Sequence, residues 1–376
     1  MATRRLTLEQ RIDSRRKDIQ SDRLSMSLGE LEALYERNEI DLHPKFQRVL
    51  RWSDQQKTRL IESLLLRIPI PPLFVAQDPN GRWDVVDGVQ RLGTCFEFLG
   101  VLVGPDGETK EPLVLKGTQL LPELKDHAFE PSDAHSLAFP DSLQRDFRRL
   151  RVDINIILKE SDESTKYELF ERLNTGGSTA SFQEVRNCVL VWMDEELYDW
   201  LKELSSLETF VASCPVSERL HDEGYRDELV LRMLTLGGED RDGLAGMGEI
   251  NSYLNRKNRV LGDSFPRARR NAAKKRFDDV FRLIGDAVGE DAFRRFDSTK
   301  ADFSGPFLIS AFEAIALGIW HNHAKWQAKT NAVSRLEALI KKMWKADEFT
   351  SAIGVGKAAQ SRIPKTIAFG RKHFIP

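Results

Sequence analysis

The sequence predicts an α+β N-terminal domain followed by an all-helical C-terminal domain. In the first half of the 376 residues, runs rich in β-branched residues, such as 73–76 and 152–158, alternate with segments of helical apolar spacing. Beyond that half only the helical spacing continues. We therefore expect two domains, residues 1–187 and 188–376, each long enough to bury its own core.

The composition restricts the protein class. A hydrophobic content of 41% and a charged content of 30% are ordinary for a soluble globular protein. A net charge of −2 restricts any contact with nucleic acid to a local basic patch. The three cysteines, Cys95, Cys188 and Cys214, have the spacing of neither a metal site nor a disulfide framework. With no apolar leader and no run of about 18 uncharged apolar residues, we expect a cytoplasmic protein without a membrane span.

The first domain is expected to build one sheet between capped helices. Ser27 and Ser53 each begin a capping box that opens an apolar helical stripe. Asp78-Pro79-Asn80-Gly81 suits a tight turn between the strands of a hairpin. We expect strands at 73–76, 82–86, 113–115 and 152–158, an extended segment at 41–48, and helices at 6–19, after 27, after 53, after 88, at 141–149 and at 166–173.

The second domain begins at a further capping box formed by Ser181 and Glu184. Each later apolar segment repeats with the helical period, and no internal repeat is apparent. The expected helical segments are 189–207, 226–236, 250–260, 268–284, 306–321 and 332–343.

The stretch 83–92 joins strand, glycine turn and helix start, and it is the main candidate site. Gly88 permits a tight turn or the close approach of a ligand, and a helix N-terminus favours anions. A purely structural alternative is a capping box with Asp87 as the N-cap and Gln90 folding back. That alternative leaves Arg91 unexplained, because a cation at a helix N-terminus is disfavoured unless an anion is near.

Three segments share a pattern with a known family. The segments are residues 46–48 with 51–52, 60–65 and 68–72; residues 86–92; and residues 170–177 with Glu184, Arg186 and Asn187. In this order they resemble the N-terminal domain family of the GmrSD modification-dependent restriction enzymes, in the ParB/sulfiredoxin-like superfamily. The resemblance implies a ParB/sulfiredoxin-like fold for the first domain.

The resemblance also implies nucleotide binding and, in some members, nucleoside triphosphate hydrolysis. The family signature is Asp-Gly-Gln-Gln-Arg, and Val89 replaces its first Gln, which weakens the expectation of hydrolysis more than that of binding. Carried over to this chain, the catalytic candidates are Asp87, Gln90, Arg91 and Glu184, and the nucleotide-binding candidates are Arg48, Gly88, Asn174, Gly176, Gly177, Arg186 and Asn187.

The chemistry of these residue types agrees with a phosphate site. Arginine forks suit phosphate oxygens, so Arg48 and Arg91 are candidate clamps, with Asp87 or Glu184 as partner for Mg²⁺ or as orienter of water. The alternatives are that Arg48 is a surface cation and that Glu184 only caps its helix.

A basic cluster is the candidate nucleic-acid contact. It comprises Arg267, Arg269, Arg270, Lys274 and Lys275. A solvated surface is the alternative, because Asp278 and Asp279 follow at once and no aromatic residue interleaves the basic ones.

Restriction enzymes of this family often carry a nuclease domain with separated His and Asn-His motifs. His321-Asn322-His323 has these residues side by side, where their side chains would point in different directions. We therefore expect no recognisable nuclease domain here and a nuclease partner in trans. The expected function is nucleoside triphosphate-dependent DNA sensing in a prokaryotic anti-phage or restriction system. The alternative is a non-enzymatic DNA-binding or protein-interaction module.

Overall fold

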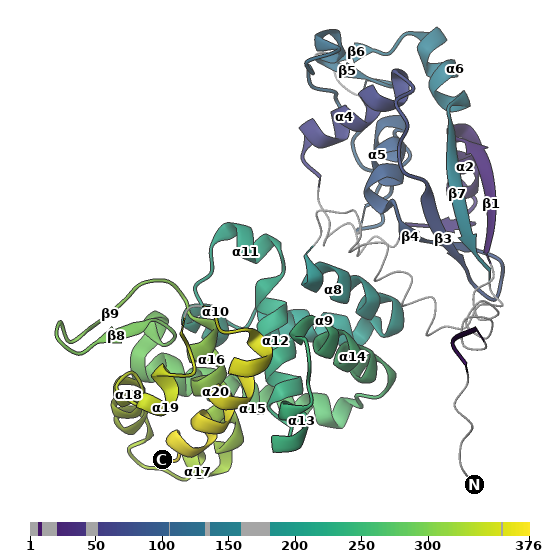
Figure 1. Ribbon diagram of the computed structural model, residues 1–376. Coiled ribbons are helices and arrows are strands. Elements are labelled where there is room, and N and C mark those ends of the chain that lie inside the picture. Colours follow the sequence, from purple (N-terminus) through teal and green to yellow (C-terminus); the bar gives the residue numbers. More distant parts are fainter. Residues whose placement is uncertain are drawn as a thin grey trace. The chain divides into compact units, whose positions relative to one another are not determined.

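A computed structural model describes residues 7–9, 21–42, 52–104, 106–131, 136–158, 181–354 and 356–376. The chain divides into two compact units, Met1–Ala180 and Ser181–Pro376 (Figure 1). The first unit mixes sheet and helices and the second is almost entirely helical, so the predicted fold class is confirmed. In the described parts of the chain, no helix is long and apolar enough to cross a membrane.

The first unit is built on a five-stranded sheet of order β1-β7-β3-β4-β2 (Figure 1). β1 (Ser21–Ser27) pairs antiparallel with β7 (Arg151–Ile157), which pairs parallel with β3 (Leu73–Gln77). β3 forms the predicted antiparallel hairpin with β4 (Trp83–Asp87), and β4 pairs parallel with β2 (Ile40–Asp41). The hairpin that leads into the candidate site therefore lies inside the sheet.

Alternation of side chains sets the buried face of this sheet. Val152, Ile154 and Ile156 of β7 are at most 5% exposed, whereas Arg151 before them and Asp153 between them are exposed. In the described residues of this unit, the structure gives the helices α2 (Leu28–Glu36), α4 (Asp54–Leu65), α5 (Val89–Leu99) and α6 (Asp141–Arg149). The predicted capping boxes at the starts of α2 and α4 are both present, which confirms those two helix starts.

The strands of this unit differ from the prediction at two places. β1 was missed because its sequence, SDRLSMS, is polar and half-exposed, and its partner β7 lies far along the chain. No strand forms at 113–115, where Leu113 and Leu115 are buried in a loop. That loop continues into η1 (Pro122–Leu124) and a small pair of strands, β5 (His127–Ala128) and β6 (Leu137–Ala138). Most of the helix expected at 6–19, and all of the one at 166–173, lie outside the described residues.

Helices occupy each segment predicted to be helical in the second unit, but the segment 189–207 is divided between two helices at Asp194. The helices are α8 (Phe182–Met193), α9 (Glu195–Ser205), α10 (Glu208–Ser213), α11 (Glu218–Asp222), α12 (Tyr225–Leu236), α13 (Arg241–Ala245), α14 (Ile250–Asp263), α15 (Arg267–Val288), α16 (Ile309–His321), α17 (His323–Gln327), α18 (Ala332–Met343), α19 (Asp347–Thr350) and α20 (Ala359–His373). A short turn η2 (Gly289–Asp291) precedes the hairpin of β8 (Arg295–Asp297) and β9 (Asp302–Ser304), which the sequence did not predict. The predicted boundary after residue 187 falls inside α8, whereas the contact units divide before it.

The core of the helical unit is α16. Every residue from Ser310 to Trp320 is buried, and α20 crosses it closely at Gly318 and Gly370. A Cβ on Gly318 would lie 2.5 Å from the Gly370 carbonyl oxygen, so a larger residue would force the two helices apart.

Candidate functional site

The candidate site is the elbow between β4 and α5. Gly88 is the N-cap of α5 in the left-handed conformation, with φ 97° and ψ 12°. A Cβ at this position would lie 2.3 Å from Leu73 Cδ2, so both backbone and packing require glycine. Asp87 lies in β4 and caps nothing, so the interpretation of Asp87 and Gln90 as a capping box was wrong. The reason is that the turn begins one residue later, at the residue that tolerates positive φ.

Arg91 ties the elbow to the segment that precedes β3. Its Nη2 donates to Asp87 Oδ2 at 2.7 Å, and its Nη1 donates to the carbonyl oxygens of Pro71 and, at 3.3 Å, Pro72. The side chains of Arg91 and Asp87 are 12% and 23% exposed. The sequence placed these residues together, but it gave no sign that proline carbonyls would share the guanidinium.

The next two positions of the signature face different surroundings. Gln90 Oε1 accepts a hydrogen bond from the Trp52 amide at 3.2 Å, so it links α5 to the residue before α4. Val89 is 5% exposed and packs in the core. An amide at position 89 would therefore be buried rather than exposed at the elbow.

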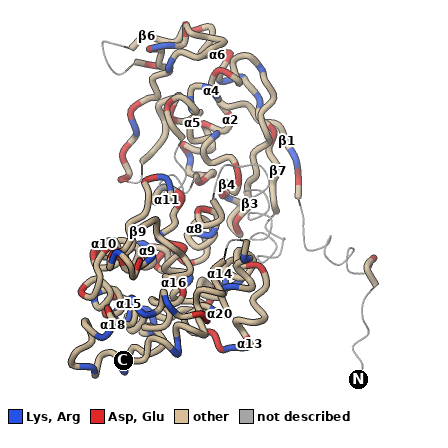
Figure 2. The backbone as a smooth tube through the Cα atoms, turned by 60° about the vertical axis from the view of Figure 1, so that its left-hand side comes forward, with Lys and Arg blue, Asp and Glu red and all other residues tan. Residues whose placement is uncertain are grey.

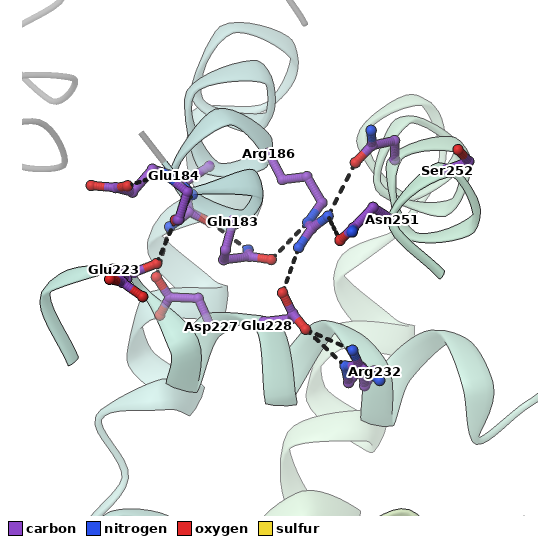
Figure 3. Close-up of polar contacts among 12 residues, drawn as sticks. Gln183, Glu184, Arg186, Glu223, Asp227, Glu228, Arg232, Asn251 and Ser252 are labelled. Carbon is purple, nitrogen blue, oxygen red and sulfur yellow. Dashed lines mark hydrogen bonds and ion pairs between the residues drawn. The ribbon is translucent and has the colours of Figure 1, made fainter. Parts of the chain in front are cut away.

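Glu184 forms the predicted capping box at the start of α8. Its Oε2 accepts from the Ser181 amide at 2.5 Å, and its own amide donates to Ser181 Oγ at 3.1 Å. Ser181 Oγ also donates to the Glu223 carbonyl oxygen at 2.7 Å, which ties α8 to the end of α11 (Figure 3). The capping interpretation is confirmed, and a catalytic role for Glu184 stays a prediction.

Arg186 lies inside the helical unit, where it is 2% exposed. Its Nε donates to Gln183 Oε1 at 2.8 Å and its Nη2 to Glu228 Oε2 at 2.7 Å (Figure 3). Its Nη1 contacts the amide oxygens of Asn251 and Asn255 at 3.3 and 3.2 Å. Arg186 therefore joins α8 to α12 and α14, which is what a structural arginine does.

The polar network extends from Arg186 across the core. Glu228 Oε1 accepts from Arg232 at 2.8 and 2.9 Å, and Arg232 continues to Glu313, which is fully buried. Burial opposes ionisation of Glu228, but Arg232 and Arg186 outweigh it and hold the pKa of that carboxyl below its ordinary value. Asn187 is 4% exposed and donates to Asp227 Oδ2 at 2.7 Å.

The predicted site residues thus belong to two different units. Asp87, Gly88, Gln90 and Arg91 meet at the elbow of the first unit. Glu184, Arg186 and Asn187 meet on α8 of the second unit. The remaining candidates, Arg48, Asn174, Gly176 and Gly177, lie outside the described residues.

The predicted basic cluster at the start of α15 is largely paired with acidic residues. Arg267 contacts Glu196 at 2.8 Å, and Arg270 and Lys274 form ion pairs with Asp194 and Glu203. Arg269 and Lys275 are exposed. In Figure 2, basic and acidic stretches alternate along this unit. Three of the five cations therefore serve the α9–α15 contact, and a DNA-binding role for this cluster stays a prediction.

The sequence His321-Asn322-His323 sends its side chains to different partners. Asn322 is buried and donates to the carbonyl oxygens of Gly318 and Arg371 at 3.1 and 2.8 Å, whereas His323 contacts Asp279 at 3.0 Å. In the part of the chain that the structure describes, no three His, Cys, Asp or Glu side chains gather as metal ligands. Cys95 is 3% exposed, and burial raises the pKa of its thiol to about 12, so it packs in the core as a protonated thiol.

Comparison with known proteins gives one family. Residues 31–191 match the family described as GmrSD restriction endonuclease, N-terminal domain. The matched segment runs from α2 to α8, so it includes both the elbow and the polar start of α8. No curated protein and no solved structure matches the chain. The family match indicates a protein of restriction or anti-phage systems. Residues 31–191 of this chain are therefore similar to the N-terminal domain of GmrSD restriction endonucleases.

Proposed function

We propose that this protein senses DNA in a prokaryotic restriction or anti-phage system and binds a nucleoside triphosphate at the elbow of residues 87–91. The observation that carries the proposal is the family match together with the Asp87-Gly88 and Gln90-Arg91 pairs of the signature at a glycine N-cap. A nuclease that acts in trans would supply DNA cleavage.

The elbow has the chemistry that a polyphosphate needs. α5 has 11 residues, and in the described residues no side chain caps its N-terminus, where amide groups and the positive end of the helix dipole favour an anion. A phosphate that takes the place of Asp87 on Arg91 would leave the Asp87 carboxylate available to hold Mg²⁺ or to orient water. One carboxylate with phosphate oxygens is a usual ligand set for Mg²⁺, which would neutralise phosphate charge.

A second candidate function is a non-enzymatic DNA-binding or protein-interaction module. Two observations favour it: Arg91 already has a carboxylate partner, and position 89 holds a buried valine where the family signature has Gln. In such a module the elbow would be a structural joint, with Arg91 fixing the Pro71–Pro72 segment to α5.

The test is nucleotide binding and turnover by the full chain. Thermal shift with ATP, GTP, CTP and UTP, each with and without Mg²⁺, should reveal a ligand, because a ligand at 100 times its Kd stabilises by about 2.7 kcal/mol. Arg91→Ala should lose the shift, and Arg82→Ala, at an exposed arginine of the same hairpin, should keep it. The melting temperature of each variant without nucleotide separates lost binding from lost fold.

The outcomes separate the two candidates. Phosphate release from the nucleotide that rises when duplex DNA is added supports the sensing function. Nucleotide binding without phosphate release would reduce the proposed function to nucleotide binding alone. The absence of any nucleotide shift, or an unchanged shift in a folded Arg91→Ala variant, would leave the interaction module as the function.

A further inference from the structure

Three cationic side chains and a histidine, from four helices, gather at the C-terminal end of α16. We call them the α16-end cluster: Arg276 of α15, His321 of α16, Lys325 of α17 and Arg371 of α20. Burial lowers the pKa of His321, and so do Arg371, Arg276 and Lys325, so all three cations lie within electrostatic reach of its imidazole. His321 and Lys325 are exposed, so the cluster opens to solvent.

Arg276 is held without a carboxylate. Its guanidinium lies over the Trp320 ring, 4.5 Å from the centroid, and its Nη2 donates to the Trp320 carbonyl oxygen. Its Nε is buried and has no hydrogen-bond partner in the described residues. Burial lowers the pKa of Arg276, because a desolvated cation is costly.

Arg371 likewise contacts backbone carbonyl oxygens, in its case at the end of α12. Its Nη2 donates to the carbonyl oxygens of Glu239 at 2.7 Å and Leu236 at 3.3 Å, and its Nε is also buried without a partner in the described residues. Burial lowers the pKa of Arg371, although Asp240 and Glu239 oppose this. Glu239 is itself paired with Lys257.

A purely structural role would make these arginines caps for two helix ends. The ends of α12 and α16 supply roughly −0.5 charge each. Asp240 adds one negative charge near Arg371, and Asp279 of α15, which contacts His323 and Gln327 of α17, adds another. These charges offset most of the charge of Arg276, Lys325 and Arg371. In the described residues, however, no ion pair joins these three cations to a carboxylate, so an outside phosphate would displace no carboxylate from them.

We propose that the α16-end cluster binds the phosphodiester backbone of duplex DNA. The cluster is open, carries planar guanidinium groups beside exposed cationic groups, and lacks an ion-paired carboxylate of its own, which are the features of a phosphate contact. The opposite flank of α15 is a poorer candidate, because Arg267 and Lys274 there are already paired with Glu196 and Glu203. This inference rests on the proposed contact with DNA, but it does not depend on nucleotide binding at the elbow.

The test compares two variants of the α16-end cluster with a control variant in the same helical unit. Fluorescence anisotropy would measure the affinity of the full chain for a 20-base-pair duplex between 50 and 200 mM salt, a range in which phosphate contacts are resolved. His321→Gln/Lys325→Gln removes exposed groups of the cluster, and Arg276→Gln removes the stacked guanidinium. Lys274→Gln is the matched control, because it removes one charge from the paired flank, as the exposed double variant removes the one charge of Lys325 from the cluster.

Each lost phosphate contact should reduce the slope of log K against log salt by about 0.9. We expect His321→Gln/Lys325→Gln to weaken binding about fivefold to tenfold at low salt and to flatten the slope by about one contact. The control should change neither. If Arg276→Gln does not fold, the exposed double variant still decides.

Three results would overturn the inference: no DNA binding by the native chain, an unchanged slope in the exposed double variant, or an equal loss in the control. Inorganic phosphate at millimolar concentration should compete only weakly, and full competition by it would assign the cluster to free phosphate instead. Absence of nucleotide binding by a native chain that still binds DNA would refute the nucleotide site and leave the inference about the α16-end cluster intact.

Discussion

Replacement of Arg186 distinguishes a structural arginine from a phosphate ligand. In the structure Arg186 is 2% exposed and holds Glu228, Gln183 and two asparagines. The variant Arg186→Met keeps much of the side-chain volume but removes every donor. It would leave the Glu228 carboxylate, which is 14% exposed, with Arg232 alone.

The expected loss of stability follows from these contacts. Removing one partner of a buried ion pair costs about 3–5 kcal/mol. Because Glu228 keeps two hydrogen bonds from Arg232, we expect the low end, about 3 kcal/mol. For a unit that spans residues 181–376, this corresponds to a fall in Tm of about 6–12 °C.

Differential scanning calorimetry of the full chain would measure this effect, because it can separate the transitions of two units. The control is Glu228→Gln in the Arg186→Met background. It removes the Glu228 carboxylate that has lost Arg186, and so it should recover part of the lost stability. If the free energy of unfolding of Arg186→Met lies within about 0.5 kcal/mol of the native value and nucleotide affinity is lost, the structural assignment is refuted and Arg186 is a ligand-binding residue.

Two further predictions concern the elbow and the buried network. Gly88→Ala should destabilise the first unit by about 2–4 kcal/mol, because it combines positive φ with a clash at Leu73. The control Gly81→Ala, at φ 90° in open space, should cost about 1 kcal/mol. Equal losses of the two variants in urea unfolding would disprove the clash. The lowered pKa of Glu228 gives stability that is present above the ordinary carboxyl pKa and is lost as the pH falls through the lowered value. Glu228→Gln should therefore flatten the decline of Tm of the helical unit below about pH 4.5, and an unchanged acid profile would contradict this.

Local signals in the sequence predicted the helix starts and the elbow correctly. Ser27, Ser53 and Ser181 each form the capping box that their spacing indicates, because a cap depends on residues within one turn. The turn between β3 and β4 is equally local. The capping box at Asp87 was wrong because a glycine N-cap competes with it at the next residue.

The burial and the ion-pair partners of the charged residues could not be predicted from such local signals. Arg186 and Arg267 both occur in polar stretches, yet one is buried against Glu228 and the other lies on the surface against Glu196. Nothing near either residue in the sequence specifies its partner, because the partners lie 42 and 71 positions away. A long separation in the sequence likewise hid β1, because its partner β7 comes much later in the chain.

The sequence alone determined the α+β and helical halves, the glycine elbow and the similarity of residues 31–191 to the GmrSD N-terminal domain, because periodicity, caps and signatures are properties of neighbouring residues. Only the tertiary structure decided which charges are neutralised. Arg91 turned out to be paired within the elbow, whereas Arg276 and Arg371 lack an ion-paired carboxylate in the described residues. The physical reason is that the cost of burying a charge depends on groups brought together by packing, not on its neighbours in the chain.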